Sequence, residues 1–138
     1  MNIHMLHALR QRASRLAAFI SAALVLAACA GMSGGMMPAK VADGAMTNPA
    51  GMTLYTFDKD MAGSGKSVCN GPCVAIWPAF TATADAKGAG DWSVATRDDG
   101  SRQWAYKGKP LYTFARDARP GDKTGDGFNN NIWHVARP

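Results

Sequence analysis

The sequence contains no glutamate and little histidine or cysteine. All ten acidic side chains among its 138 residues are Asp, so chemistry that depends on Glu carboxylates is excluded. With three His in the chain, two of them within the first seven residues, a zinc site built from several His is disfavoured. Charged residues make up 18 % and hydrophobic residues 47 %, which argues against disorder along the whole chain.

Hydrophobic runs long enough to cross a membrane are also missing from the N-terminal segment. Arg10, Arg12 and Arg15 precede an apolar run over residues 16–28 that only Ser21 interrupts. This run is shorter than the about 20 residues that a membrane span needs, and it is typical of the central region of a signal peptide. We therefore predict an export signal over residues 1–28.

The apolar run ends in a short motif, LAAC, at residues 26–29. It resembles the lipobox of bacterial lipoproteins, which implies lipidation of the Cys29 thiol, cleavage before it and acylation of the new N-terminus. Ala30 stands where a retention Asp could have stood, and the resemblance to proteobacterial lipoproteins therefore implies the outer membrane, on either of its faces. The alternative is a plain secretory signal in which Cys29 is incidental.

Basic residues do not form a run that could follow a nucleic-acid backbone. Once the signal is removed, twelve Lys and Arg face ten Asp, and they are scattered through the chain. Residues 63–67 (GSGKS) imitate the end of a phosphate-binding loop, but Asp60 stands where its first Gly belongs. We expect neither a nucleic acid nor a nucleotide as partner.

The predicted mature chain divides into a linker and one small domain. Residues 29–51 are rich in Gly, Ala, Met and Pro and lack aromatic residues, so we expect a flexible tether there and a folded domain over 52–138. The tether also offers thioether sulfurs that could bind Cu(I) in the envelope, although simple apolar filler explains them as well. These methionines are Met32, Met36, Met37 and Met46.

An internal repeat is the most informative pattern in the domain. Residues 51–60 (GMTLYTFDKD) align with residues 108–117 (GKPLYTFARD). Each copy then passes through a Gly-rich loop to an Ile-Trp pair, at 76–77 and at 132–133. We assign one repeat to about 51–78 and the other to about 108–136.

The repeated motif alternates in the manner of a β-strand and ends in an Asp. Its aromatic residues should share one face of a strand, and each Asp should accept backbone N–H groups and close the following loop. A packed aromatic core explains this motif without a ligand, and a binding role is the alternative. The motif residues are Tyr55, Phe57, Asp60, Tyr112, Phe114 and Asp117.

Further strands are expected between and after the repeats. Residues 92–96 and 103–106 alternate, a turn signal at 98–100 separates them, and Lys107-Gly108 turns into the next strand. With residues 132–136, the pattern predicts at least five short, mostly antiparallel strands and one helical turn or two at 73–77. The expected class is a small all-β domain, a sandwich or a meander.

Several motifs occur here in the order found in one bacterial family. They are the two Tyr-x-Phe-x-x-Asp motifs, the CNGPC and WP segments, the QWAYKGKPLY run and the PGD before the last Trp. Over about residues 50–138 the chain resembles the predicted lipoproteins with a repeated Yx(FWY)xxD motif, the secreted repeat family. The resemblance implies an envelope lipoprotein and no particular chemistry.

The two remaining cysteines are expected to form a disulfide. If Cys29 is lipidated, Cys69 and Cys73 are left together in an oxidising compartment, and the Asn-Gly-Pro between them permits a tight bend. A redox or metal-binding thiol pair is the alternative. Their spacing is not that of thioredoxin.

A loop rich in Asp and Gly could bind a cation. Residues 122–127 (DKTGDG) are similar to the first half of a calcium loop, and Asp122, Asp126 and Asn129 supply oxygen atoms. Trp133 stands where such a loop needs its bidentate Glu. The alternative is a loop selected for its turn geometry.

The functional expectation is a non-enzymatic envelope module that acts in structure or interaction. After the signal only His134 remains, so a Ser-His-Asp arrangement would depend on that single residue. Exposed members among four aromatic residues could form a patch for an envelope protein partner, although they are first of all core candidates: Trp92, Trp104, Tyr106 and Trp133. The alternative function is a metal or redox role in the envelope. No cofactor is expected.

Overall fold

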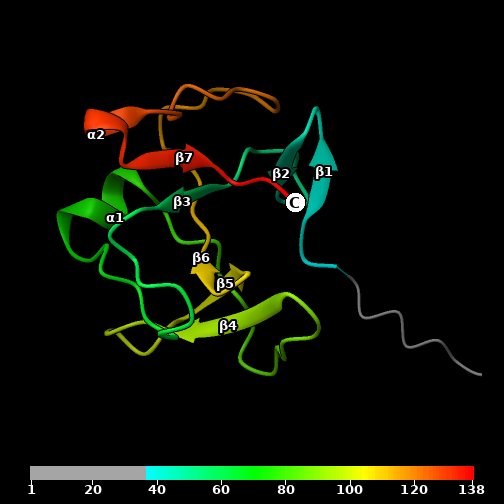
Figure 1. Ribbon diagram of the computed structural model, residues 1–138, viewed down its shortest axis with the longest axis vertical. Helices are drawn as coiled ribbons and strands as arrows, with labels where there is room; N and C mark the ends of the chain where they lie inside the picture. Colours follow the sequence, from blue (N-terminus) through cyan, green and yellow to red (C-terminus); the bar gives the residue numbers. More distant parts are fainter. Residues whose placement is uncertain (1–36) are drawn as a thin grey trace, which may run out of the picture. The chain divides into compact units, whose positions relative to one another are not determined.

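The computed structural model describes residues 37–138, which form an all-β unit of three small antiparallel sheets with two very short helices (Figure 1). The elements within these residues are β1 (Lys40–Ala42), β2 (Ala45–Thr47), β3 (Tyr55–Phe57), α1 (Pro72–Ile76), β4 (Trp92–Thr96), β5 (Arg102–Tyr106), β6 (Lys109–Pro110), α2 (Phe128–Asn131) and β7 (Trp133–Val135). None of the helices in this part of the chain is long and apolar enough to cross a membrane.

Strands β1 and β2 form a hairpin that corrects the expected boundary of the tether. The Asp43-Gly44 turn between them has positive φ at both residues, 48° and 72°, as the tight hairpin turns require. The Met46 N–H donates to the Ala136 carbonyl at 2.8 Å, which ties the hairpin to the end of the chain. The folded domain therefore includes residues 40–47, which we had expected in the tether over 29–51, and it begins before residue 52.

Composition misled the prediction for this segment because small apolar residues can line a core as well as a linker. Ala45 is fully buried and Met46 is 3 % exposed. Met46 packs in a core cluster with Leu54 and Leu111. It is therefore not a free thioether in a tether, and this corrects the copper hypothesis at that position.

Strands β3 and β7 bring the two repeats together (Figure 1). Strand β3 comes from the first repeat and β7 from the second, and in their antiparallel register Tyr55 faces Val135 and Phe57 faces Trp133. Alternation places Tyr55 and Phe57 in the core and leaves Thr56 half-exposed. The strand expected over 132–136 is thus confirmed, and its partner belongs to the other copy.

The predicted meander is present as β4, β5 and β6. Trp92 pairs with Tyr106 and Thr96 with Arg102, and the expected Lys107-Gly108 turn has φ values of 49° and 79°. The second Leu-Tyr-Thr-Phe segment is less regular than we expected, because β6 ends at Pro110. Tyr112 instead makes isolated bridges to Tyr55 and Ala79. Tertiary pairing between the repeats replaces a continuous strand at this point.

Aromatic residues from both repeats share one core. Phe57 stacks on Trp133 at 4.2 Å between ring centroids, Trp133 on Trp77 at 3.7 Å, and Trp77 on Phe114 at 4.4 Å. Along this single stack, Phe57 and Trp77 of the first repeat alternate with Trp133 and Phe114 of the second. Offset and stacked aromatic pairs of this kind add to the stabilisation that burial alone gives.

Candidate functional site

The Tyr and Asp of the repeated motif form hydrogen bonds between the repeats. The Tyr55 hydroxyl donates to Asp117 Oδ2 at 2.6 Å, and the Tyr112 hydroxyl donates to Asp60 Oδ2 at 2.5 Å. All four residues are less than a tenth exposed. Each repeat therefore supplies the tyrosine for the carboxylate of the other.

The second oxygen of each carboxylate closes a loop, as the sequence predicted. Asp60 Oδ1 accepts the Val68 N–H at 2.7 Å, and Asp117 Oδ1 accepts the Thr124 N–H at 3.0 Å. The bond to the tyrosine of the other repeat was not predicted from the sequence. The feature of the sequence that could have indicated this bond is that both copies carry one phenol and one carboxylate at the same spacing.

Burial raises the pKa of Tyr55, Tyr112 and Asp60. Desolvation raises the pKa of both Tyr55 and Tyr112 well above the usual value, and the hydrogen bond to the Asp acts in the same direction. Burial also raises the pKa of Asp60, although hydrogen bonds and the charge of Arg97 oppose it. The motif residues thus lie inside the protein with their polar atoms engaged, which favours the interpretation of the motif as a core.

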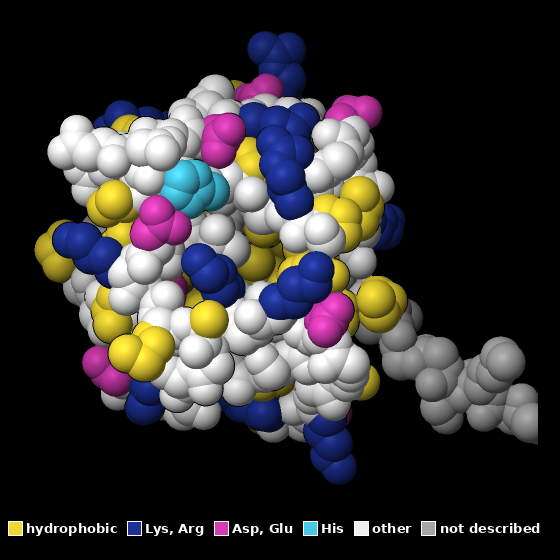
Figure 2. Space-filling model, viewed as in Figure 1, with side chains coloured by type: hydrophobic (Ala, Val, Ile, Leu, Met, Phe, Trp, Pro, Cys, Tyr) yellow, Lys and Arg dark blue, Asp and Glu magenta, His cyan; other side chains and the backbone are white. Residues whose placement is uncertain are grey.

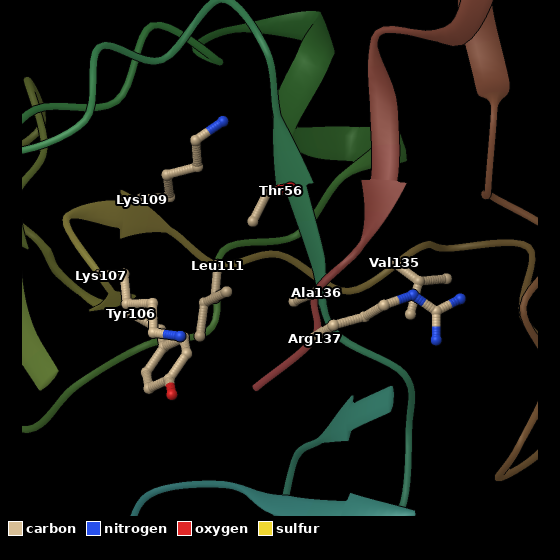
Figure 3. A pocket seen from close by; sticks show the side chains of 8 residues that line it. All are labelled: Thr56, Tyr106, Lys107, Lys109, Leu111, Val135, Ala136 and Arg137. Atoms are coloured by element: carbon tan, nitrogen blue, oxygen red, sulfur yellow. The ribbon is translucent and has the colours of Figure 1, made fainter. Parts of the chain in front are cut away.

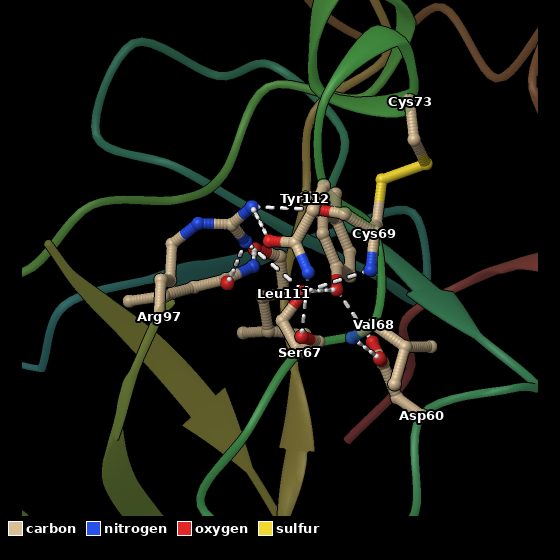
Figure 4. The surroundings of a disulfide bond; sticks show 10 residues. Asp60, Ser67, Val68, Cys69, Cys73, Arg97, Leu111 and Tyr112 are labelled. Atoms are coloured by element: carbon tan, nitrogen blue, oxygen red, sulfur yellow. Dashed lines mark hydrogen bonds between the residues drawn. A yellow bond between two sulfur atoms is a disulfide. The ribbon is translucent and has the colours of Figure 1, made fainter. Parts of the chain in front are cut away.

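A buried arginine, which we did not predict from the sequence, extends the contact between Tyr112 and Asp60 (Figure 4). Arg97 is 4 % exposed and donates to Gln103 Oε1 at 2.6 Å and to the Cys69 carbonyl at 2.5 Å. It also donates to Ser67 Oγ at 3.0 Å, which lies 2.6 Å from the Tyr112 hydroxyl. A continuous line of hydrogen bonds thus joins the arginine to Asp60.

The expected disulfide between Cys69 and Cys73 is confirmed. Their Cα atoms lie 5.3 Å apart, and the bridge spans the start of the helical turn α1, which was also expected (Figure 4). Cys69 is fully buried and its carbonyl accepts from Arg97. The bridge therefore holds the segment that contributes Ser67 to the polar network.

The two carboxylates of the loop considered for calcium accept backbone N–H groups. Asp122 Oδ2 accepts the N–H groups of Ala118 and Arg119, and Asp126 Oδ1 accepts the N–H of Val135 at 3.0 Å. Asn129 has a left-handed φ of 52°. Within residues 37–138 no three His, Cys, Asp or Glu side chains gather as a metal site would require. These contacts favour the turn-geometry alternative.

Several predicted features lie outside the described residues. They are the export signal over 1–28, the lipidation site Cys29, and the thioethers of Met32 and Met36. Met37 is described and is 64 % exposed. The lipid anchor and the copper hypothesis for these methionines stay predictions.

Of the four aromatic residues considered for a surface patch, two belong to the core. Trp92 and Trp133 are buried. Trp104 and Tyr106 are partly buried and pack against the second core cluster. Tyr106 also contributes to a hollow on the surface, together with residues that the sequence did not single out.

This hollow is a groove of about 280 Å³ beside β3 and β7. Leu111, Val135 and Ala136 line it with buried apolar side chains. Three basic residues also line it: Lys107, Lys109 and Arg137. Figure 3 shows the two lysines on one side and Arg137 on the other, and Figure 2 shows Lys and Arg side chains around hydrophobic ones on this face. We call these residues the basic groove.

Within the part of the chain that the structure describes, no cation of the basic groove forms an ion pair, although the charge of Lys109 acts on the Asp60 carboxyl. Within residues 37–138, the contacts of 4.0 Å or less between a basic side chain and a carboxylate are Lys66 with Asp98 and His134 with Asp58, and the second is an ion pair only when His134 is protonated. Neither involves a groove residue. Lys107 and Lys109 are two residues apart, but Arg137 is distant in the sequence, so the sequence did not show the three cations as one cluster.

Comparison with known proteins gives one family. A family described as a secreted repeat of unknown function matches residues 38–81 and 93–137, which is more than half of the chain. No curated protein and no solved structure matches. The two matched segments contain the two Tyr-Asp motifs that bind each other across the core, and the chain belongs to this family of secreted repeats.

Proposed function

We propose that the protein is a non-enzymatic binding module of the bacterial cell envelope, anchored to the outer membrane through lipid on Cys29. The family description, a secreted repeat, supports the compartment. The lipobox and the absence of Asp at position 30 support the anchor and its membrane. The finding that Tyr55 and Tyr112 use their hydroxyls on carboxylates of the opposite repeat supports the non-enzymatic part.

This last observation carries the proposal. A catalytic acid or base must reach a proton of the substrate, but the motif carboxylates are buried and each is bonded at both oxygens. The motif is therefore a scaffold, and recognition is left to the surface that this scaffold presents. The basic groove is a part of that surface that combines a hollow, an apolar lining and cations outside any ion pair.

The anchor is tested by metabolic labelling in a Gram-negative host. Cells that express the full chain are grown with radioactive palmitate, and we expect label in the wild type and none in Cys29→Ser. Ala30→Asp is the matched variant for sorting, because it should keep the label but move the protein from the outer to the inner membrane fraction. An unlabelled wild type refutes the anchor, and unchanged sorting of Ala30→Asp refutes the assignment to the outer membrane.

A further inference from the structure

The basic groove combines an apolar lining with basic side chains on its two sides. Its lining is apolar at Leu111, Val135 and Ala136, and cations approach it from both sides (Figure 3). One Arg137 N–H donates to the Gly44 carbonyl at 3.1 Å, which fixes the guanidinium while leaving other donors free. Lys107 lies 5.2 Å from the centre of the Tyr106 ring. These contacts hold positive charge beside the groove without neutralising it.

We infer that the basic groove binds a ligand that carries a phosphate group and a small apolar portion. Three cations on the two sides of the groove favour a phosphate, whose several oxygen atoms can accept from different donors. A guanidinium fork with two ammonium groups is a common set of donors for phosphate oxygens. The apolar lining accommodates the carbon skeleton next to the phosphate. A volume of about 280 Å³ fits one such group and is too small for a folded partner.

Two sources can supply this chemistry in the envelope. One is a soluble phosphomonoester, and the other is the phosphodiester headgroup of an anionic lipid. The inference depends on the proposed role as a binding module and does not depend on the lipid anchor. Failure of phosphate binding would leave the palmitate result unchanged, so the two failures can be told apart.

The test is a titration of the full chain with each ligand, in which NMR monitors the backbone amide signals. The two ligands are sn-glycerol 3-phosphate and a monomeric short-chain phosphatidylglycerol, with glycerol and short-chain phosphatidylcholine as their uncharged and zwitterionic counterparts. We expect at least one anionic ligand to shift the amides of Lys109 and Ala136 with saturation, and the affinity to fall as salt is added. Binding of the first alone identifies a soluble phosphate, and binding of the second alone identifies a lipid headgroup.

Variants locate the binding to the groove. Lys109→Gln and Arg137→Gln should each weaken the anionic ligand by about tenfold, the usual size of one hydrogen bond to a charged group. Lys107→Asn should act in the same direction, and Asn suits the left-handed φ of 49° at that turn. Lys87→Gln is the control, since Lys87 is exposed and does not line the groove.

The inference is overturned by either of two results. One is that both anionic ligands shift the groove amides no more than their counterparts do. The other is that Lys87→Gln weakens binding as much as the groove variants. Thermal unfolding of each variant near the wild-type midpoint shows that a loss of binding is not a loss of the fold.

Discussion

Tyr55 and Tyr112 occupy equivalent positions in the two repeats, and they exchange both of their backbone hydrogen bonds, at 2.8 and 3.0 Å. Their side chains continue this exchange, since each hydroxyl donates to the Asp of the opposite repeat. The pattern places an approximate two-fold axis between the two tyrosines. Equivalent substitutions in the two repeats should therefore have similar effects.

Removal of one phenolic hydroxyl should destabilise the fold. Tyr112→Phe leaves Asp60 Oδ2 buried without its donor, so we expect a loss of about 1–3 kcal/mol in the free energy of unfolding. Tyr55→Phe should cost a similar amount. Tyr106→Phe is the control with an expected change within about 0.5 kcal/mol, because Tyr106 lies partly exposed. Urea unfolding of the three variants checks this, and equal stability of Tyr112→Phe and Tyr106→Phe would contradict it.

Stability should decline at alkaline pH. Burial and the Asp partners raise the folded-state pKa of Tyr55 and Tyr112 above the ordinary value of 10.0. As the pH rises past that value, the unfolded chain loses phenolic protons that the folded chain keeps, so the free energy of unfolding falls. The stabilisation that these two phenols give the fold is complete below the ordinary pKa. It is lost as the pH rises from that value toward the raised folded-state pKa.

This decline is measured by urea unfolding at a series of alkaline pH values. Tyr112→Phe should make the dependence on pH shallower, because one of the two phenols is gone. Phenolate absorbance from both residues should appear together with unfolding. Ionisation of Tyr55 and Tyr112 in the still-folded protein near the ordinary value would disprove the prediction.

The buried arginine should tolerate no substitution well. Arg97→Lys keeps the charge but cannot reach Gln103 Oε1 and the Cys69 carbonyl together, so we expect a loss of about 2 kcal/mol. Arg97→Met removes all donors and should cost about 3 kcal/mol or more. Arg119→Lys, at an exposed position, serves as the matched control. Thermal and urea unfolding measure the differences, and a neutral Arg97→Lys would contradict the role of the fork.

Gly125 should be restricted by the aromatic stack. A Cβ at this position would lie 2.7 Å from Trp77 Cη2 and 3.1 Å from the Phe114 ring. We expect Gly125→Ala to cost about 1–3 kcal/mol through overpacking. Gly121→Ala is a useful comparison, because its φ of 89° adds backbone strain while nothing lies near its Cβ. If Gly125→Ala unfolds like the wild type, the stack must be able to shift at Trp77.

Local features of this protein could be predicted from its sequence. The alternation around Tyr55 indicated a strand, Asp60 indicated a closed loop, and the spacing of Cys69 and Cys73 indicated a bridge. Each of these depends on residues close together in the chain, where spacing fixes geometry. The two hydrogen bonds from tyrosine to aspartate span 62 and 52 residues, and nothing local determines them.

The hairpin was missed although a local signal for it was present. Asp43-Gly44 is a dipeptide that tight hairpin turns favour, and Ala45 and Met46 pair with the neighbouring β1, but composition led us to assign the segment to a tether. The burial of Ala45 and Met46 depends instead on the distant end of the chain, where the Ala136 carbonyl accepts the Met46 N–H. The basic groove also depends on tertiary structure, because it forms where the end of the chain passes the β5–β6 turn.

Because each repeat supplies the hydrogen-bond donor for the buried carboxylate of the other, the domain resembles a symmetric dimer whose two halves are joined in one chain. A single repeat would bury a tyrosine without its acceptor and a carboxylate without its donor, so it would have to find a second copy of itself. Such a pair would dissociate on dilution. Here the connection between the repeats keeps both halves at a high effective concentration, so the interface persists however few molecules are present.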